Sequence, residues 1–147
     1  MSDLVVREAS SADVLALRMA VLRPGFPVEA GDYDGFPDVR HVAAYDGDQV
    51  VGCATVFPAP YDGEPAAWQL RGMAVAPDRQ RQGIGALVLR HAIELVSAAG
   101  APLIWAHART TALPFYERLG FDAVGEQYLH GPLRLTHRLI VRRLTRG

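Results

Sequence analysis

The sequence Gln80-Arg81-Gln82-Gly83-Ile84-Gly85 decides how this chain folds. It follows the apolar run 68–75, which is typical of a strand, and it leads into residues 84–98, whose apolar side chains recur at helical spacing. Glycines at such a turn let the backbone approach a ligand closely, and the first turn of the helix presents unpaired N–H groups at the positive end of its dipole. The stretch therefore predicts an anion site, of the kind most often used for phosphate.

Length and composition indicate an ordinary globular domain. Of the 147 residues, 50% are hydrophobic and 21% are charged, which fits a single domain spanning residues 1–147. The net charge of −1 gives no reason to expect a nucleic acid or an acidic membrane as partner. No apolar run is long enough to span a membrane and no signal sequence is evident, so we expect a cytoplasmic protein. The one cysteine, Cys53, lies in an apolar run and is expected to be a buried, inert thiol.

The remaining patterns predict a mixed α/β sheet with helices on its faces. Strands are expected at residues 4–8, 41–45, 49–57, 68–75, 102–108, 121–124 and 135–144, and helices between Ser10 and Pro24, over 84–98 and over 113–119. The turn Asp46-Gly47-Asp48 and the short connection after 49–57 predict an antiparallel meander. The strand–helix–strand order over 68–108 predicts a parallel pair joined by a right-handed crossover.

The connection 24–40 is rich in Gly, Pro and Asp, and it carries Phe26, Tyr33 and Phe36. A connection of this length is uncommon in a compact domain and is usually functional or mobile. Two interpretations stand side by side: a lid or wall over a binding site, and a packed surface loop.

The glycine-rich turn does not match the two commonest nucleotide-binding motifs. A Walker loop needs Lys-Ser/Thr after the glycines to reach phosphate and magnesium, and neither follows Gly85. A dinucleotide fingerprint needs a third glycine, where this chain has Val88, and an acidic residue at the end of the second strand, where it has His107 and Ala108. ATP and NAD are therefore disfavoured as ligands.

Two segments of the chain resemble the GNAT (GCN5-related) N-acetyltransferase superfamily. The family signature Gln/Arg-x-x-Gly-x-Gly/Ala is matched by Gln80, Gly83 and Gly85, and the run 71–75 before it resembles the family's fourth strand. The segment 112–121, Ala-Leu-Pro-Phe-Tyr-Glu-Arg-Leu-Gly-Phe, resembles a second family motif, and the order of elements fits over essentially the full length. The resemblance implies a GNAT-like fold in which strands 1–4 are antiparallel and the parallel strands 4 and 5 splay apart around acetyl-CoA.

For the acetyl donor, the resemblance implies a site built mainly from backbone. The residues expected to bind acetyl-CoA are Met73, Ala74, Val75, Gln80, Arg81, Gln82, Gly83, Ile84, Gly85, Ala86, Arg109 and Phe115. Amides of residues 81–86 would cradle the pyrophosphate, and Arg79 and Arg81 would add positive charge. The fourth strand would pair with the pantetheine arm, and one of its N–H groups would polarise the thioester carbonyl.

The resemblance also suggests which residues transfer protons during the reaction. Tyr116 matches the family's frequent general acid, which would protonate the departing CoA thiolate, although the pattern alone is more typical of a core aromatic. A base is needed because an alkyl ammonium, with a pKa of about 10.4, cannot attack a thioester until it loses a proton. The candidates for the base are Glu126 first, then Glu8, His107 and His137. Many relatives carry Asn where His107 stands, so the role of His107 is left open.

The expected acceptor is a primary amine of a small molecule, with a peptide, a polyamine and an aminoglycoside left open. Acidic residues in 24–40 would favour a cation, whereas Arg23 and Arg71 would favour a carboxylate. The alternative function is an acyl-CoA sensor that keeps the fold without turnover. The five histidines show no metal-ligand spacing, so no metal is expected. A homodimer in which the last strand pairs between copies is also compatible with the sequence.

Overall fold

The structure, a computed structural model, describes residues 4–22, 37–131 and 133–144. The strands are β1 (Leu4–Ala9), β2 (Arg40–Asp46), β3 (Gln49–Pro58), β4 (Trp68–Val75), β5 (Leu103–Arg109), β6 (Asp122–His130) and β7 (Leu135–Arg143), and the α-helices are α1 (Ser11–Leu22), α2 (Ile84–Ala98) and α3 (Leu113–Arg118). Short 3₁₀ turns, Pro77–Arg79 and Thr110–Ala112, lie ahead of α2 and α3. Most of the predicted lid or loop, residues 23–36, lies outside the described residues.

The strands form one mixed sheet in the order β1-β2-β3-β4-β5-β7-β6. β1 to β4 pair antiparallel, β4 and β5 are parallel, and β7 lies antiparallel between β5 and β6. The predicted mixed sheet is confirmed, with its meander and its parallel pair. One expectation is wrong: the last strand, β7, cannot pair with another copy of the chain, because it has a strand partner on each side.

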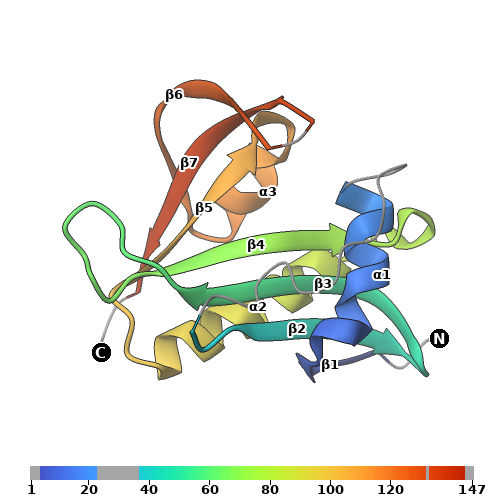
Figure 1. The fold of residues 1–147 in the computed structure, drawn as a ribbon. Helices are drawn as coiled ribbons and strands as arrows, with labels where there is room; N and C mark the ends of the chain where they lie inside the picture. The colour runs from blue at the N-terminus through green and yellow to red at the C-terminus, as the bar shows by residue number, and fades with distance from the viewer. Residues whose placement is uncertain (1–3, 23–36, 132, 145–147) are drawn as a thin grey trace.

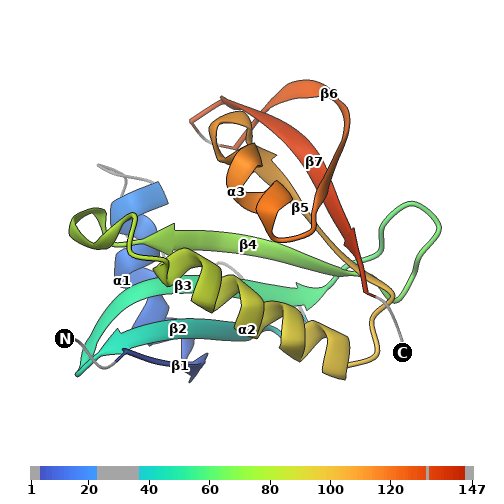
Figure 2. The same cartoon turned by 180° about the vertical axis from the view of Figure 1, so that it is seen from behind.

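Helices cover both faces of the sheet (Figures 1 and 2). α1 lies on one face, and α2 and α3 lie on the other. An ideal Cβ at Gly52 of β3 would lie 2.7 Å from Cγ2 of the buried Ile84, so glycine lets the start of α2 sit directly on the sheet. This contact fixes the position of the turn that precedes α2.

A smaller core lies beneath α1. Val14 of this helix packs in a cluster with Tyr45, Cys53 and Ala74 from the sheet. The Tyr45 hydroxyl donates a hydrogen bond of 2.8 Å to the Asp13 carboxylate, which holds α1 against β2. Burial raises the pKa of Cys53 to about 12, so this residue is a thiol at neutral pH, as expected of an inert buried cysteine.

The sheet splits between β4 and β5 (Figure 1). In the described part of the chain these strands pair only through Trp68 with Ile104 and Gln69 with Trp105. The remaining described residues of β4 do not pair with β5. β4 also carries an extra residue relative to β3 in the segment 71–74, and such a bulge increases the local twist. The expected divergence of strands 4 and 5 is confirmed.

The final hairpin is longer than the sequence predicted. β6 runs over Asp122–His130, well past the expected end at Val124. Gly125 has a φ of 73°, and the pairing with β7 shifts register between Val124 and Tyr128. This irregularity breaks the alternating pattern without ending the strand, and the longer strand places Tyr128 and His130 on the sheet.

Candidate active site

A cavity of about 1240 Å³ opens where β4 and β5 diverge. Its lining comes from α1, β4, the turn before α2, the start of α2, β5, α3 and the β6–β7 hairpin. Because α1 lies on one face of the sheet and α2 and α3 lie on the other, the cavity passes through the gap in the sheet.

The turn from Gln80 to Gly85 forms the part of the cavity at the start of α2. Gly83 immediately precedes the helix with a φ of 79°, a left-handed conformation that glycine adopts without strain. No side chain caps the helix there, so the amides of its first turn are open to an anion. The Gln80 side-chain amide donates a hydrogen bond of 3.3 Å to the Val75 carbonyl, which ties the turn to the end of β4.

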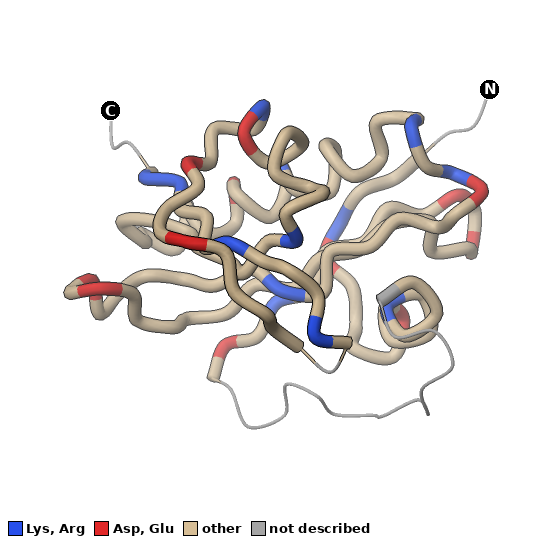
Figure 3. Tube along the Cα trace, turned by 90° about the horizontal axis from the view of Figure 1, so that it is seen from above, with Lys and Arg blue, Asp and Glu red and all other residues tan. Residues whose placement is uncertain are grey.

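Arginine supplies the permanent charge of the cavity wall. The lining arginines are Arg18, Arg71, Arg81, Arg90, Arg109 and Arg118, whereas no described residue that lines the cavity is acidic. Arg79, expected to add charge at the turn, instead pairs with Asp46 of the β2–β3 hairpin. Figure 3 shows basic positions in the centre of the molecule and acidic positions on the outer hairpins. A ligand that carries several phosphates fits this wall.

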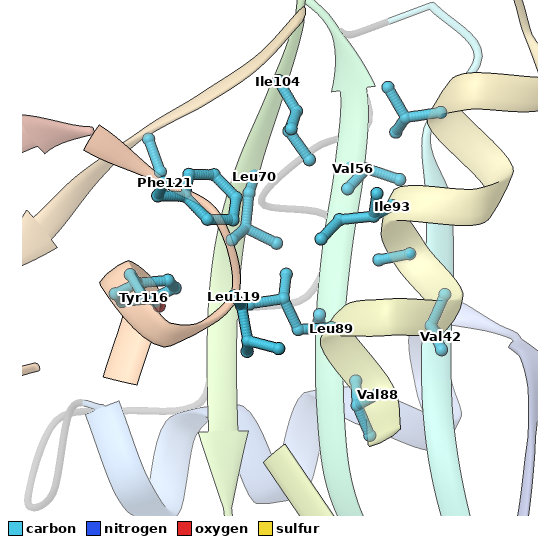
Figure 4. Close-up of a cluster of buried hydrophobic side chains, with 14 of the residues drawn as sticks. Val42, Val56, Leu70, Val88, Leu89, Ile93, Ile104, Tyr116, Leu119 and Phe121 are labelled. Atoms are coloured by element: carbon cyan, nitrogen blue, oxygen red, sulfur yellow. The ribbon is translucent and has the colours of Figure 1, made fainter. Parts of the chain in front are cut away.

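Tyr116 lines the cavity from α3. Only 8% of the residue is exposed, and its ring packs edge-on against Phe115, with the ring centroids 5.1 Å apart. It packs in the same way against Phe121, at a centroid distance of 5.6 Å (Figure 4). Arg142 of β7 donates a hydrogen bond of 2.9 Å to the Leu119 carbonyl, which fixes the end of α3. Burial raises the pKa of Tyr116 to about 12, so the phenol keeps its proton at neutral pH.

The opposite side of the gap carries a group of rings that we call the histidine cluster: His107 on β5, Tyr128 and His130 on β6, and His137 on β7. The residues on either side of His107 belong to the core beneath α2 and α3, so His107 points to the α1 face. Its ring stacks on that of His130, with centroids 4.0 Å apart, and its Nδ1 lies 2.6 Å from the Tyr128 hydroxyl. The three histidines all line the cavity.

Two members of the histidine cluster, His107 and His130, have a lowered pKa. Burial first of all, and then the neighbouring His130, His137 and Arg71, lower the pKa of His107 to about 4. Burial also lowers the pKa of His130. Neutral imidazoles can accept a proton or a hydrogen bond, which the arginines of the same wall cannot do.

The structure brings most of the sequence-predicted site residues to the cavity. Those that line it are Met73, Ala74, Val75, Gln80, Arg81, Gly83, Ile84, Gly85, Ala86, Arg109, Phe115 and Tyr116. Gln82 and Glu126 do not line it. Glu126 is exposed on β6 and borders a separate surface depression with Gln127 and Arg138.

Several residues that line the cavity were missed from the sequence. They are Arg18, Arg90, Arg118 and His130. The alternation Tyr128-Leu129-His130 is a strand signal that could have pointed to His130. Arg18 gives no local signal, because only tertiary packing brings α1 onto the sheet and buries this side chain.

Among the residues that the structure describes, no group of three or more His, Cys, Asp or Glu side chains is placed to hold a metal ion. No helix within them is long and apolar enough to cross a membrane.

Comparison with known proteins gives the family. Residues 37–123 match the family described as the Acetyltransferase (GNAT) domain. The N-acetyltransferase YitI of Bacillus subtilis strain 168 is 27% identical over 129 residues, which are 85% of this chain and 87% of that protein. The crystal structure of the ribosomal-protein-S18-alanine N-acetyltransferase from Escherichia coli superposes with a TM-score of 0.78 at 18% identity, covering 99% of this chain and 96% of that one. An aminoglycoside 6′-N-acetyltransferase complexed with coenzyme A superposes with a TM-score of 0.74 at 19% identity, covering 97% and 99%.

A mixed sheet that splits between two parallel strands, with a glycine-rich turn at the split, defines the acetyltransferase class of fold. The chain belongs to the GNAT family and is an acetyl-CoA-dependent N-acetyltransferase.

Proposed function

We propose that the chain transfers the acetyl group of acetyl-CoA directly to a primary amine of a small molecule, with Tyr116 as general acid. The observation that carries the proposal is the cavity between β4 and β5, which joins the glycine-rich turn and Tyr116 on one face to the histidine cluster on the other. Acetyl-CoA and the amine can both bind in this cavity, so the acetyl group can pass between them without an acyl-enzyme intermediate. The one cysteine, Cys53, supports direct transfer because it is buried, protonated and outside the cavity lining.

The donor would bind along the turn and β4. Amides of residues 81–86, Gln82 included, would hold the pyrophosphate, with Arg81, Arg109 and the missed Arg90 adding positive charge. The backbone of residues 73–75 would pair with the extended arm of CoA, since this part of β4 has no partner in β5. Phe115 would pack against the same arm. These groups fit a long polyanionic cofactor better than a compact nucleotide.

Tyr116 would assist departure of the thiolate. Its pKa of about 12 keeps the proton on the phenol until the thiolate forms. A thiol has an ordinary pKa of about 8.5, so complete proton transfer from the phenol is uphill unless another proton is supplied. The nitrogen of the attacking amine loses protons in the same reaction, and one of these can return to the phenol through solvent.

The acceptor cannot be taken from the fold, because the similar structures named above act on a ribosomal protein and on an aminoglycoside. The cavity wall supports a narrower proposal. Six arginines line it and none of its described residues is acidic, so it would repel a polycation. We therefore favour a molecule with one amine and a neutral or anionic remainder.

The test is thiol release from acetyl-CoA across a panel of amines, with monoamines, amino acids, polyamines and aminoglycosides as arms. The chain contains no lysine, so acetyl groups cannot be lost to its own ε-amines. Turnover is expected with at least one small amine. Tyr116→Phe should lower kcat by about 100-fold, within the range of a general acid, and leave the CoA dissociation constant within about twofold.

Tyr45→Phe is the matched control, because Tyr45 is buried like Tyr116 and lies outside the cavity. It should leave kcat unchanged. Tight CoA binding with no thiol release for any amine would replace the proposal by the acyl-CoA sensor.

A further inference from the structure

The histidine cluster is assembled on one face of the β5–β7–β6 part of the sheet. Tyr128 of β6 and Arg109 of β5 stand directly opposite His137 of β7 in the strand registers. His137 lies within ring contact of Tyr128 and His130, with centroid distances of 6.4 and 5.2 Å. Residues from three strands therefore converge on His137.

A backbone hydrogen bond fixes the tautomer of His137. Its Nδ1 lies 2.6 Å from the Leu135 carbonyl oxygen. A carbonyl oxygen only accepts, so Nδ1 carries the proton and donates it. The neutral ring then has its lone pair on Nε2, which is the nitrogen left for a ligand in the cavity.

The reaction needs a proton acceptor at this end of the cavity. A primary amine with a pKa of about 10.4 arrives as an ammonium ion at neutral pH. None of the described residues that line the cavity is Asp or Glu, and the lining arginines cannot accept a proton. The lining side chains that can accept the proton are the imidazoles of His107, His130 and His137.

The three histidines differ in their contacts. His107 is stacked on His130, and its Nδ1 is engaged by the Tyr128 hydroxyl. Burial weakens both of these imidazoles as bases, since it lowers the pKa of each. His137 is the member whose ring is held by a backbone acceptor in the tautomer that a base requires.

We propose that Nε2 of His137 is the general base that takes the proton from the acceptor's ammonium group. The neutral amine then attacks the thioester carbonyl carbon, the C–N bond forms, and the C–S bond breaks with its electron pair on sulfur. The nitrogen loses its second proton as the amide forms, and the thiolate takes one proton from Tyr116 or solvent. One proton per turnover is released, and it leaves through His137. The proposal rests on the proposed amine acetyltransferase function.

The titratable and charged groups around His137 come from several strands and from one helix. Facing it are Arg109 and His107 from β5 and Tyr128 and His130 from β6. On the other strands and helices, Arg71 of β4 lies close to His107 and His130, and Arg18 of α1 lines the same cavity. No carboxylate is among these groups, so none of them competes with His137 as a carboxylate base.

The test is the pH profile of kcat/KM for the best amine of the panel, in the wild type and in His137→Gln. The wild-type value should rise with pH through the titration of an imidazole. The variant should lose about 100-fold at pH 7 and bind CoA within about twofold of the wild type. It should recover much of the lost rate as the pH approaches about 10.4, where the amine itself loses its proton. In His137→Ala, added imidazole should restore part of the activity, an effect that a purely structural role would not give.

Two variants make the result decisive. His91→Gln replaces a histidine on α2 that does not line the cavity, and its pH profile should match the wild type. Glu126→Gln tests the rival base predicted from the sequence. The assignment is overturned if His137→Gln keeps both rate and profile, or if Glu126→Gln alone removes the imidazole-like rise. If the wild type acetylates no amine, the proposed function is wrong and the assignment of His137 falls with it, so the two failures are distinct.

Discussion

The two walls of the cavity are built in different ways. The wall that we propose for the donor, called the donor wall, runs from Gly72 of β4 through the following turn to Ala86, and it offers main-chain groups. The wall that we propose for the acceptor, called the acceptor wall, brings together Arg71, His107, His130 and His137 from four strands, and it offers side chains. Backbone donors can bind the same cofactor whatever side chains surround them, whereas an acceptor site made of side chains changes with every substitution. This difference explains how one fold can keep acetyl-CoA as its acetyl donor while the acceptor substrate varies.

The largest expected effect is on the donor wall. An ideal Cβ at Gly85 would lie 3.4 Å from both the Phe115 ring and the Val75 side chain, so a leucine there would extend among the groups that line the cavity. Gly85→Leu should weaken CoA binding by about 100-fold, or roughly 2.7 kcal/mol, measured by titration calorimetry. Ser97→Leu adds the same bulk on the exposed far end of α2 and should leave affinity unchanged. If Gly85→Leu binds CoA with the wild-type affinity, acetyl-CoA does not bind beside Gly85.

A smaller effect separates two arginines of the donor side. Arg81 is exposed and lines the cavity, whereas Arg79 is paired with Asp46. Arg81→Gln should raise the CoA dissociation constant about threefold at low salt, and the difference should shrink in 0.5 M salt because exposed charges are screened. Arg79→Gln should lower thermal stability more than affinity. The reverse ranking of the two variants would show that the turn binds phosphate in another orientation.

The third effect concerns the acceptor wall and appears in stability rather than in affinity. The folded-state pKa of His107, about 4, lies below the ordinary histidine value of about 6.5, so the unfolded chain binds its proton first. The stability contribution is therefore complete above about pH 6.5 and is lost as the pH falls towards 4. His107→Asn should reduce the loss of stability between pH 7 and pH 4.5, by about 1 kcal/mol in urea unfolding.

The residual pH dependence in His107→Asn should come partly from His41 and His130, since burial lowers the pKa of both. CoA affinity should not change, because His107 belongs to the acceptor wall. Equal pH dependence in both proteins, or a loss of CoA affinity in the variant, would contradict the division into two walls.

The same division decides how much the sequence could predict. The strand, glycine turn and helix around Gly83 are encoded by neighbouring residues, and the meander and the parallel pair followed from local patterns of this kind. The donor residues came from the family resemblance and stay a prediction. Arg79 was misjudged because its partner, Asp46, lies in a distant hairpin. His130 was missed because Gly125 interrupts the strand pattern of β6. The histidine cluster as a whole depends on the register of three strands, which no local pattern reveals.

The short β4–β5 pairing has a further consequence for the sheet as a whole. Past Gln69, β4 is an open strand edge located inside the molecule rather than at its rim. Open edges usually recruit other strands and risk aggregation, but this one is enclosed by α3 and the β6–β7 hairpin. Its amides that point away from β3 should exchange with deuterium faster than those that point towards it. An extended ligand that enters the slot would act as an additional strand and would slow that exchange.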